Sequence, residues 1–98
     1  MNFNDELLVG RVVFSKQGRD KGRYYLIKSR IEPDFAFCVN GCERKIDNPK
    51  KKRRKHLGLT KTVFDISFDE NKEGSKDALI RKLLKKFSEK TSEGGGYV

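Results

Sequence analysis

The sequence predicts a small, mainly β protein: a five-stranded antiparallel barrel followed by a C-terminal α-helix. The chain has 98 residues, which is enough for one small domain. Between residues 7 and 68, short runs of β-branched and aromatic residues alternate with turn residues such as Gly, Pro and Asn. After residue 75 the apolar residues recur at helical spacing instead. Closing so small a sheet into a barrel protects strand edges that an open sheet would expose.

The first two strands are expected on either side of a turn that contains glycine. Residues 7–14 and residues 23–31 are both rich in β-branched or aromatic residues. Gly18 and Gly22 lie in the polar segment that separates them. Pro33 predicts the next turn, because the proline ring fixes one of the turn dihedrals.

The pair Asn40-Gly41 predicts a β-hairpin. Residues 35–39 precede it and residues 42–46 follow it, and both are expected as strands. Asn-Gly accepts the positive φ angles of a type I′ turn, whose twist matches that of paired strands.

The barrel is expected to span residues 7–68, with a basic loop at 48–57 that follows the hairpin. A fifth strand is predicted within 59–68, where every second residue is apolar: Phe64, Ile66 and Phe68.

An amphipathic helix is predicted over residues 75–91, between an N-terminal arm (1–6) and a flexible tail (92–98). Ser75 can cap the helix, and Asp77 suits its positive end. Five apolar residues recur at helical spacing on what is predicted to be one face: Leu79, Ile80, Leu83, Leu84 and Phe87. This face is expected to pack on the barrel.

The net charge is strongly positive, and much of it lies in one run. The chain carries 23 Lys and Arg against 14 Asp and Glu, a formal charge of +9, and its pI is about 9.7. Six consecutive cations occupy Lys50–Lys55. Such a run either stays solvated or meets a dense array of anions, and a nucleic acid carries a phosphate charge about every 1.7 Å of duplex axis. A solvated charged segment and a nuclear import signal are the alternative interpretations, but the position of the run inside a folded domain favours nucleic-acid contact.

No apolar run is long enough to span a bilayer. The N-terminus also lacks the basic segment and long apolar segment of a signal peptide. We therefore expect a cytoplasmic protein with no membrane partner. Two cysteines agree with a reducing compartment and do not suggest a disulfide scaffold.

Residues 9–23 resemble the KOW motif, which joins the first two strands of an SH3-like barrel. The segment Gly18-Arg19-Asp20-Lys21-Gly22-Arg23 fits the loop of that motif closely, with Arg where Lys is common. Further similarity comes from the Asn-Gly pair, the Asn-Pro-Lys-Lys-Lys run at 48–52, the Lys-His-Leu at 55–57 and the short C-terminal helix. Over roughly residues 6–90 the chain is thus similar to bacterial KOW-domain RNA-binding proteins, which are themselves similar to a large-subunit ribosomal protein family of archaea and eukaryotes.

The resemblance implies a small five-stranded SH3-like (KOW) barrel that binds ribosomal RNA as a structural component of the large subunit. Neighbouring ribosomal proteins are the further partners it implies. It also implies that Gly22 is the essential glycine of the motif, needed for its backbone angle or for close approach, and that Asp20 braces the loop internally. The RNA-binding residues it indicates are Lys16, Arg19, Lys21, Arg23, Lys50, Lys51, Lys52, Arg53, Arg54, Lys55 and His56, with Gly18, Gly22, Asn40 and Gly41 as structural residues of the motif and hairpin.

Two other functions fit the same residues. One is a ribosome-associated or RNA-remodelling factor present at low occupancy. The other is a transcription-linked KOW module that binds polymerase or nascent RNA, since KOW barrels also occur in transcription elongation factors.

Four aromatic residues are interpreted as packing residues. In an alternating strand only one of Tyr24 and Tyr25 can be free to stack on a base, and a packing role is favoured for both. Phe35 and Phe37 are interpreted as core.

No enzyme, cofactor, metal or small-molecule substrate is expected. The single histidine, His56, has no partner spacing typical of a catalytic pair, and Leu57 beside it is expected to anchor the loop in the core. Cys38 and Cys42 fall short of the four ligands of a structural zinc site. The predicted hairpin would direct them to opposite faces, so both are expected as free thiols.

Overall fold

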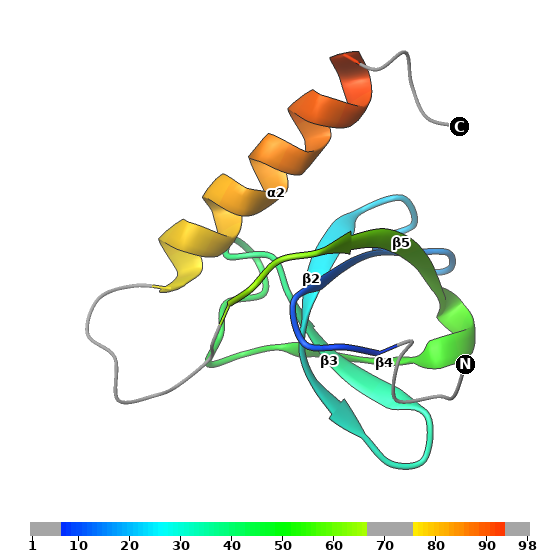
Figure 1. Cartoon of the computed structure of the whole chain (residues 1–98). Helices are drawn as coiled ribbons and strands as arrows, with labels where there is room; N and C mark the ends of the chain where they lie inside the picture. The colour runs from blue at the N-terminus through cyan, green and yellow to red at the C-terminus, as the bar shows by residue number, and fades with distance from the viewer. Residues whose placement is uncertain (1–6, 67–75, 94–98) are drawn as a thin grey trace.

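A computed structural model of the chain describes residues 7–66 and 76–93. The elements in chain order are β1 (Arg11–Ser15), β2 (Tyr24–Ile31), β3 (Phe35–Val39), β4 (Lys50–Arg53), the 3₁₀ helix η1 (Arg54–His56), β5 (Leu57–Val63) and α2 (Lys76–Glu93). The five strands form one sheet in the order β4-β3-β2-β1-β5, and every pairing is antiparallel. The strands curl around a common interior while α2 lies across one side (Figure 1). The predicted fold class, a mainly β SH3-like barrel with a C-terminal helix, is confirmed.

The sheet has two apolar faces, and each builds its own core. Adjacent residues of a strand point to opposite faces, so Val13 faces the interior and Val12 faces α2. The interior core consists of Leu7, Val13, Tyr25, Ile27, Ala36, Cys38 and Leu57. The second core lies under the helix and consists of Val12, Leu26, Val39, Ile80 and Phe87.

The helix packs on the barrel as predicted, with one exception among its apolar residues. Ile80 and Phe87 are buried, and Leu83 and Leu84 are half-buried against the second core. Leu79 is 40% exposed, because it lies at the edge of the apolar face. Asp77 accepts a hydrogen bond from the backbone N–H of Ile46 at 2.8 Å, which ties the first turn of α2 to the loop before β4.

The predicted hairpin at Asn40-Gly41 is wrong. Residues 42–46 do not form a strand, and β3 pairs instead with β4, placing Phe37 opposite Lys51 and Cys38 opposite Lys50. The segment 48–57, predicted as a basic loop, therefore contains an edge strand and a 3₁₀ turn. A lysine-rich edge strand is well suited to solvent, because charge discourages pairing with another chain.

The Asn-Gly pair has a different role, which is to let α2 approach. Of the two residues in this pair, Gly41 has a positive φ, +78°, and Asn40 does not. A type I′ turn requires a positive φ at both central residues. A Cβ at Gly41 would collide with the backbone oxygen of Asp77 and with Arg81. The side-chain oxygen of Asn40 accepts hydrogen bonds from the backbone N–H groups of Cys42 and Arg44, at 2.9 and 3.0 Å, and so shapes the turn.

The remaining boundaries differ from the predictions at strand ends. β1 begins at Arg11, not at residue 7, because Gly10 (φ +91°) turns the chain. Leu7 is nevertheless buried in the interior core. The last strand is β5, and the alternating residues Phe64 and Ile66 lie beyond its end but still pack against the second core. The helix continues to Glu93, so residues 92 and 93 belong to α2 and not to the predicted tail. Phe68, Ser75, residues 1–6 and residues 94–98 lie outside the described residues.

Candidate nucleic-acid interface

The segment that resembles the KOW motif forms the connection between β1 and β2, which we call the β1–β2 loop (residues 16–23). Its base is closed by two backbone hydrogen bonds: Ser15 N–H donates to the Arg23 carbonyl at 3.0 Å, and Gly22 N–H donates to the Ser15 carbonyl at 2.8 Å. Gly18 and Gly22 have φ angles of +94° and +91°. No atom of the protein lies within 4 Å of a Cβ placed at Gly22, so within the folded chain the backbone angle, and not close packing, favours glycine at this position.

The cations of this loop are exposed. Lys16, Arg19, Lys21 and Arg23 all lie on the surface. Arg23 is partly engaged, because its guanidinium lies 2.6 Å from the carboxylate of Glu43. Surface pairs of this kind contribute little to stability, so Arg23 remains available to another anion.

Asp20 braces the loop from within, as predicted. Its carboxylate accepts hydrogen bonds from the hydroxyls of Ser15 (2.8 Å) and Tyr25 (2.7 Å) and from the ammonium of Lys52 (3.2 Å). Burial alone would raise the pKa of Asp20, but the hydrogen bonds from Tyr25, Ser15 and Lys52 outweigh it and hold the pKa below its ordinary value. Burial, together with the bond to Asp20, raises the pKa of Tyr25. The carboxylate is therefore ionised and accepts three hydrogen bonds from the protein's own donors.

Lys52 is not the surface cation that the basic run suggests. Its side chain is 9% exposed, and its Nζ donates to Ser15 Oγ at 2.9 Å, to the Gln17 carbonyl at 3.3 Å and to Asp20. Strand alternation turns Lys52 inward while its neighbours Lys51 and Arg53 face solvent. Lys52 is therefore removed from the set of predicted phosphate contacts.

The outward side chains of β4 gather over an aromatic ring. Lys51 Nζ lies 4.6 Å and Arg53 Cζ 4.7 Å from the ring centroid of Phe35, within the range of cation–π attraction. Phe35 and Phe37 are half-buried, so their assignment to the core is wrong. The alternation of β3 instead buries Ala36 and Cys38.

The 3₁₀ turn η1 lies against the β1–β2 loop. Lys16 N–H donates to the His56 carbonyl at 2.9 Å, and Lys16, Gln17, Lys55 and His56 line a hollow of about 370 Å³. In Figure 1, η1 is the short green helical turn just before β5. Two cationic segments that are far apart in the sequence thus meet on one surface. Leu57 is buried directly after η1 and anchors it, as predicted.

The rest of the basic run is distributed around this surface. Lys50 is half-buried with its Nζ 4.0 Å from Asp20. Arg53 lies 3.8 Å from Asp34. The Arg54 guanidinium reaches the Leu57 carbonyl at 3.5 Å, and its backbone N–H donates to the Asp34 carbonyl.

Further exposed cations that were not among the predicted site residues lie on α2. Lys82, Lys85 and Lys86, together with Glu89, line a hollow of about 360 Å³ on the side of the helix that faces solvent. Helical spacing places these lysines opposite the apolar face, so their exposure could have been predicted from the sequence.

Both cysteines are free thiols, but for a reason other than the predicted hairpin. Cys38 is buried in β3, where burial raises the pKa of its thiol to about 12. Cys42 is exposed in the turn that follows. Within residues 7–66 and 76–93, no three His, Cys, Asp or Glu side chains gather as a metal site would require.

Across the same residues, no helix has the length and apolar character needed to cross a bilayer. Comparison of the sequence with family models and with curated proteins finds no match to this chain.

Proposed function

We propose that this chain is a KOW-domain RNA-binding protein associated with the ribosome, where it contacts large-subunit ribosomal RNA as a structural component. The observation that carries the proposal is the meeting of the β1–β2 loop with η1. Lys16 and Lys55 flank one hollow there, and Arg19 and Lys21 are exposed on the same loop. The sequence resemblance to the KOW motif falls on this loop.

The proposed mechanism is electrostatic. Exposed ammonium and guanidinium groups neutralise phosphates and release counterions, while the closed base of the loop keeps them in a fixed arrangement. Recognition of RNA backbone by shape suits a rigid loop on a small barrel. The four cations Lys16, Arg19, Lys21 and Lys55 form the primary contact set, and Lys51 and Arg53 extend it along β4.

Sedimentation of a cell lysate through a sucrose gradient, with washes at low and high salt, tests the association. Near-stoichiometric protein with the large subunit after a moderate-salt wash supports a structural component. Low occupancy that is lost on washing favours an accessory factor. Protein found only at the top of the gradient contradicts ribosome association and directs attention to copurification with polymerase.

Matched variants test the surface. R19Q/K21Q/K55Q removes three cations from the proposed contact set, and K82Q/K85Q/K86Q removes three from α2. If the proposal is correct, the first variant leaves the subunit at markedly lower salt than the second. Equal loss from both variants would point to a general effect of net charge.

A further inference from the structure

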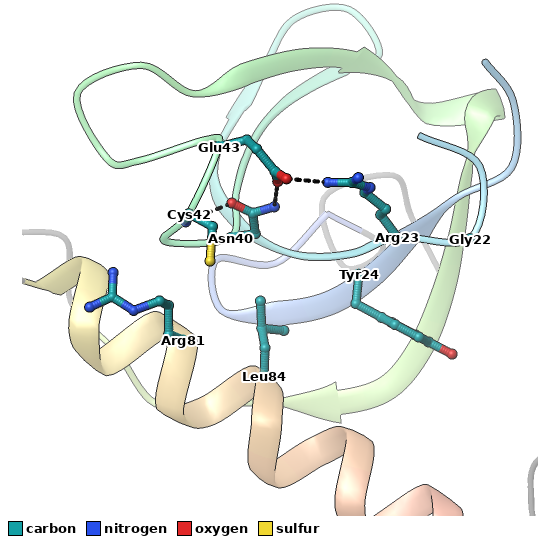
Figure 2. Close-up of a pocket in the computed structure, with 8 residues that line it drawn as sticks. All are labelled: Gly22, Arg23, Tyr24, Asn40, Cys42, Glu43, Arg81 and Leu84. Carbon is teal, nitrogen blue, oxygen red and sulfur yellow. Dashed lines mark hydrogen bonds and ion pairs between the residues drawn. The ribbon is translucent and has the colours of Figure 1, made fainter. Parts of the chain in front are cut away.

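A cleft of about 440 Å³ opens where the end of the β1–β2 loop, the turn after β3 and α2 meet. Arg23 and Tyr24 border it on one side, Asn40, Cys42 and Glu43 on the second, and Arg81 and Leu84 on the third. Figure 2 shows Glu43, Asn40 and Arg23 joined above the helix, with the sulfur of Cys42 directed toward α2. Its volume falls within the range of small-molecule sites, and it is separate from the hollow between Lys16 and His56.

The polar edge of the cleft offers a hydrogen-bond acceptor, the exposed carboxylate of Glu43. Glu43 receives Arg23 NH1 on Oε2 at 2.6 Å and Asn40 Nδ2 on Oε1 at 3.1 Å. An ionised carboxylate has about four lone-pair positions, so each oxygen can accept one more donor. The hydrogen bonds from Arg23 and Asn40 lower the pKa of Glu43, which keeps the group ionised at neutral pH.

The other walls suit a flat, partly apolar group. Leu84 is half-buried. The Tyr24 ring packs edge-on against Phe14 and in a tilted arrangement against Phe87, with centroid separations of 5.9 and 5.3 Å. The guanidinium of Arg81 is fixed by a 2.6 Å hydrogen bond to the Gly41 carbonyl. Two arginines and one carboxylate leave the cleft with net positive charge, which suits a base that carries its own phosphate.

We infer that this cleft binds one unpaired guanine base of RNA, with the two oxygens of Glu43 accepting from its N1–H and N2–H groups. Guanine alone presents two adjacent donors on its Watson–Crick edge, whereas adenine and cytosine place an acceptor beside a single donor. Unpaired bases are commonly read on this edge by protein side chains. The inference rests on the proposed RNA binding and adds a base preference to it.

The test uses the full chain and two short oligouridine RNAs that differ by one central nucleotide, guanosine or adenosine. A well-formed pair of hydrogen bonds discriminates between bases by about 1–3 kcal/mol, so the guanosine RNA should bind about 5- to 160-fold more tightly. Glu43→Gln should abolish this ratio. Asp47→Asn is the matched control, because Asp47 is exposed outside the cleft and the change in charge is identical.

Cys42 supplies a second readout that does not depend on affinity. It lines the cleft and is exposed, while Cys38 is buried, so a maleimide should label Cys42 alone in the folded protein. The guanosine RNA should slow this labelling more than the adenosine RNA at equal occupancy. Equal affinities with equal labelling rates would overturn the guanine site while leaving backbone binding intact. Failure of both RNAs to bind at low salt would overturn the proposed function and the cleft assignment together.

Discussion

Lys52 and Asp20 form an ion pair inside the barrel, with Nζ 3.2 Å from Oδ1 and exposed side-chain fractions of 9% and 12%. The pair joins edge strand β4 to the β1–β2 loop across 32 positions of sequence. It also shares Ser15, whose hydroxyl donates to Asp20 and accepts from Lys52. The most cationic strand of the chain is therefore fastened through one inward lysine, which leaves Lys51 and Arg53 to solvent.

Replacing Lys52 with methionine should destabilise the fold although the apolar stem is kept. Asp20 would remain buried with only the more distant Lys50, 4.0 Å away, to balance its charge, and removal of one partner from a buried pair costs about 3–5 kcal/mol. Because Tyr25 and Ser15 still donate to Asp20, we expect a smaller loss, about 2–3 kcal/mol. Urea unfolding followed by circular dichroism measures the loss. Lys51→Met is the matched control, expected within about 0.5 kcal/mol of wild type, and an equal loss in both variants would contradict the buried role of Lys52.

Asp20 should also make stability depend on acid pH. Its pKa is lower in the folded protein than the ordinary value of about 3.9 expected in the unfolded chain. The contribution to stability is therefore fully present above about pH 4 and is lost as the pH falls toward the folded pKa. The free energy of unfolding, measured from pH 6 down to pH 2, should decline steeply below about pH 4. Asp20→Asn should be less stable at pH 6 and should show a shallower decline, and an unchanged slope would contradict the assignment.

Apolar patterning explains which elements could be predicted from the sequence. Runs of β-branched and aromatic residues marked β1, β2 and β3, which contribute buried residues to both faces of the sheet. Helical spacing marked α2, because one face of the helix is buried. Strand β4 reads Lys-Lys-Lys-Arg, so no apolar residue marks its inward face. The strand forms by pairing with β3. Lys52 is buried because it pairs with the carboxylate of Asp20, which lies too far away in the sequence for a local pattern to predict the contact.

The candidate site was visible in its composition but not in its geometry. The exposed cations of the β1–β2 loop follow from the KOW-like segment. The contact of Lys16 with His56, and the removal of Lys52 from the surface, are long-range consequences of folding. The hairpin predicted at Asn40-Gly41 was wrong for a similar reason. Glycine is needed at position 41 because Asp77 and Arg81 of α2 approach it closely. The residues adjacent in sequence carry no sign of this long-range contact.

Two glycines with similar backbone angles should respond differently to alanine. Gly22→Ala meets no atom within 4 Å, so only the left-handed backbone is strained, at about 1–2 kcal/mol. Gly41→Ala adds a collision with Asp77 and Arg81 and should loosen the docking of α2. Thermal unfolding should show a clearly larger fall in melting temperature for Gly41→Ala. Equal shifts would mean that the helix accommodates a methyl group, and the assigned role of Gly41 would then be wrong.

Three lysines, Lys52 of β4, Lys55 of η1 and Lys21 of the β1–β2 loop, should separate positioning from phosphate contact. An exposed cation that neutralises a phosphate contributes about 0.7–0.9 to the slope of log K against log salt. Lys55→Gln and Lys21→Gln should each reduce the slope of RNA binding by about that amount. Lys52→Met should weaken binding through the loosened β1–β2 loop while leaving the slope unchanged, because its ammonium already serves Ser15, Gln17 and Asp20. The measurement is fluorescence anisotropy of a labelled RNA at five or more salt concentrations, below the temperature at which Lys52→Met begins to unfold. A reduced slope for Lys52→Met would show that this lysine reaches phosphate after all, and an unchanged slope for Lys55→Gln and Lys21→Gln would remove the η1 surface from the interface.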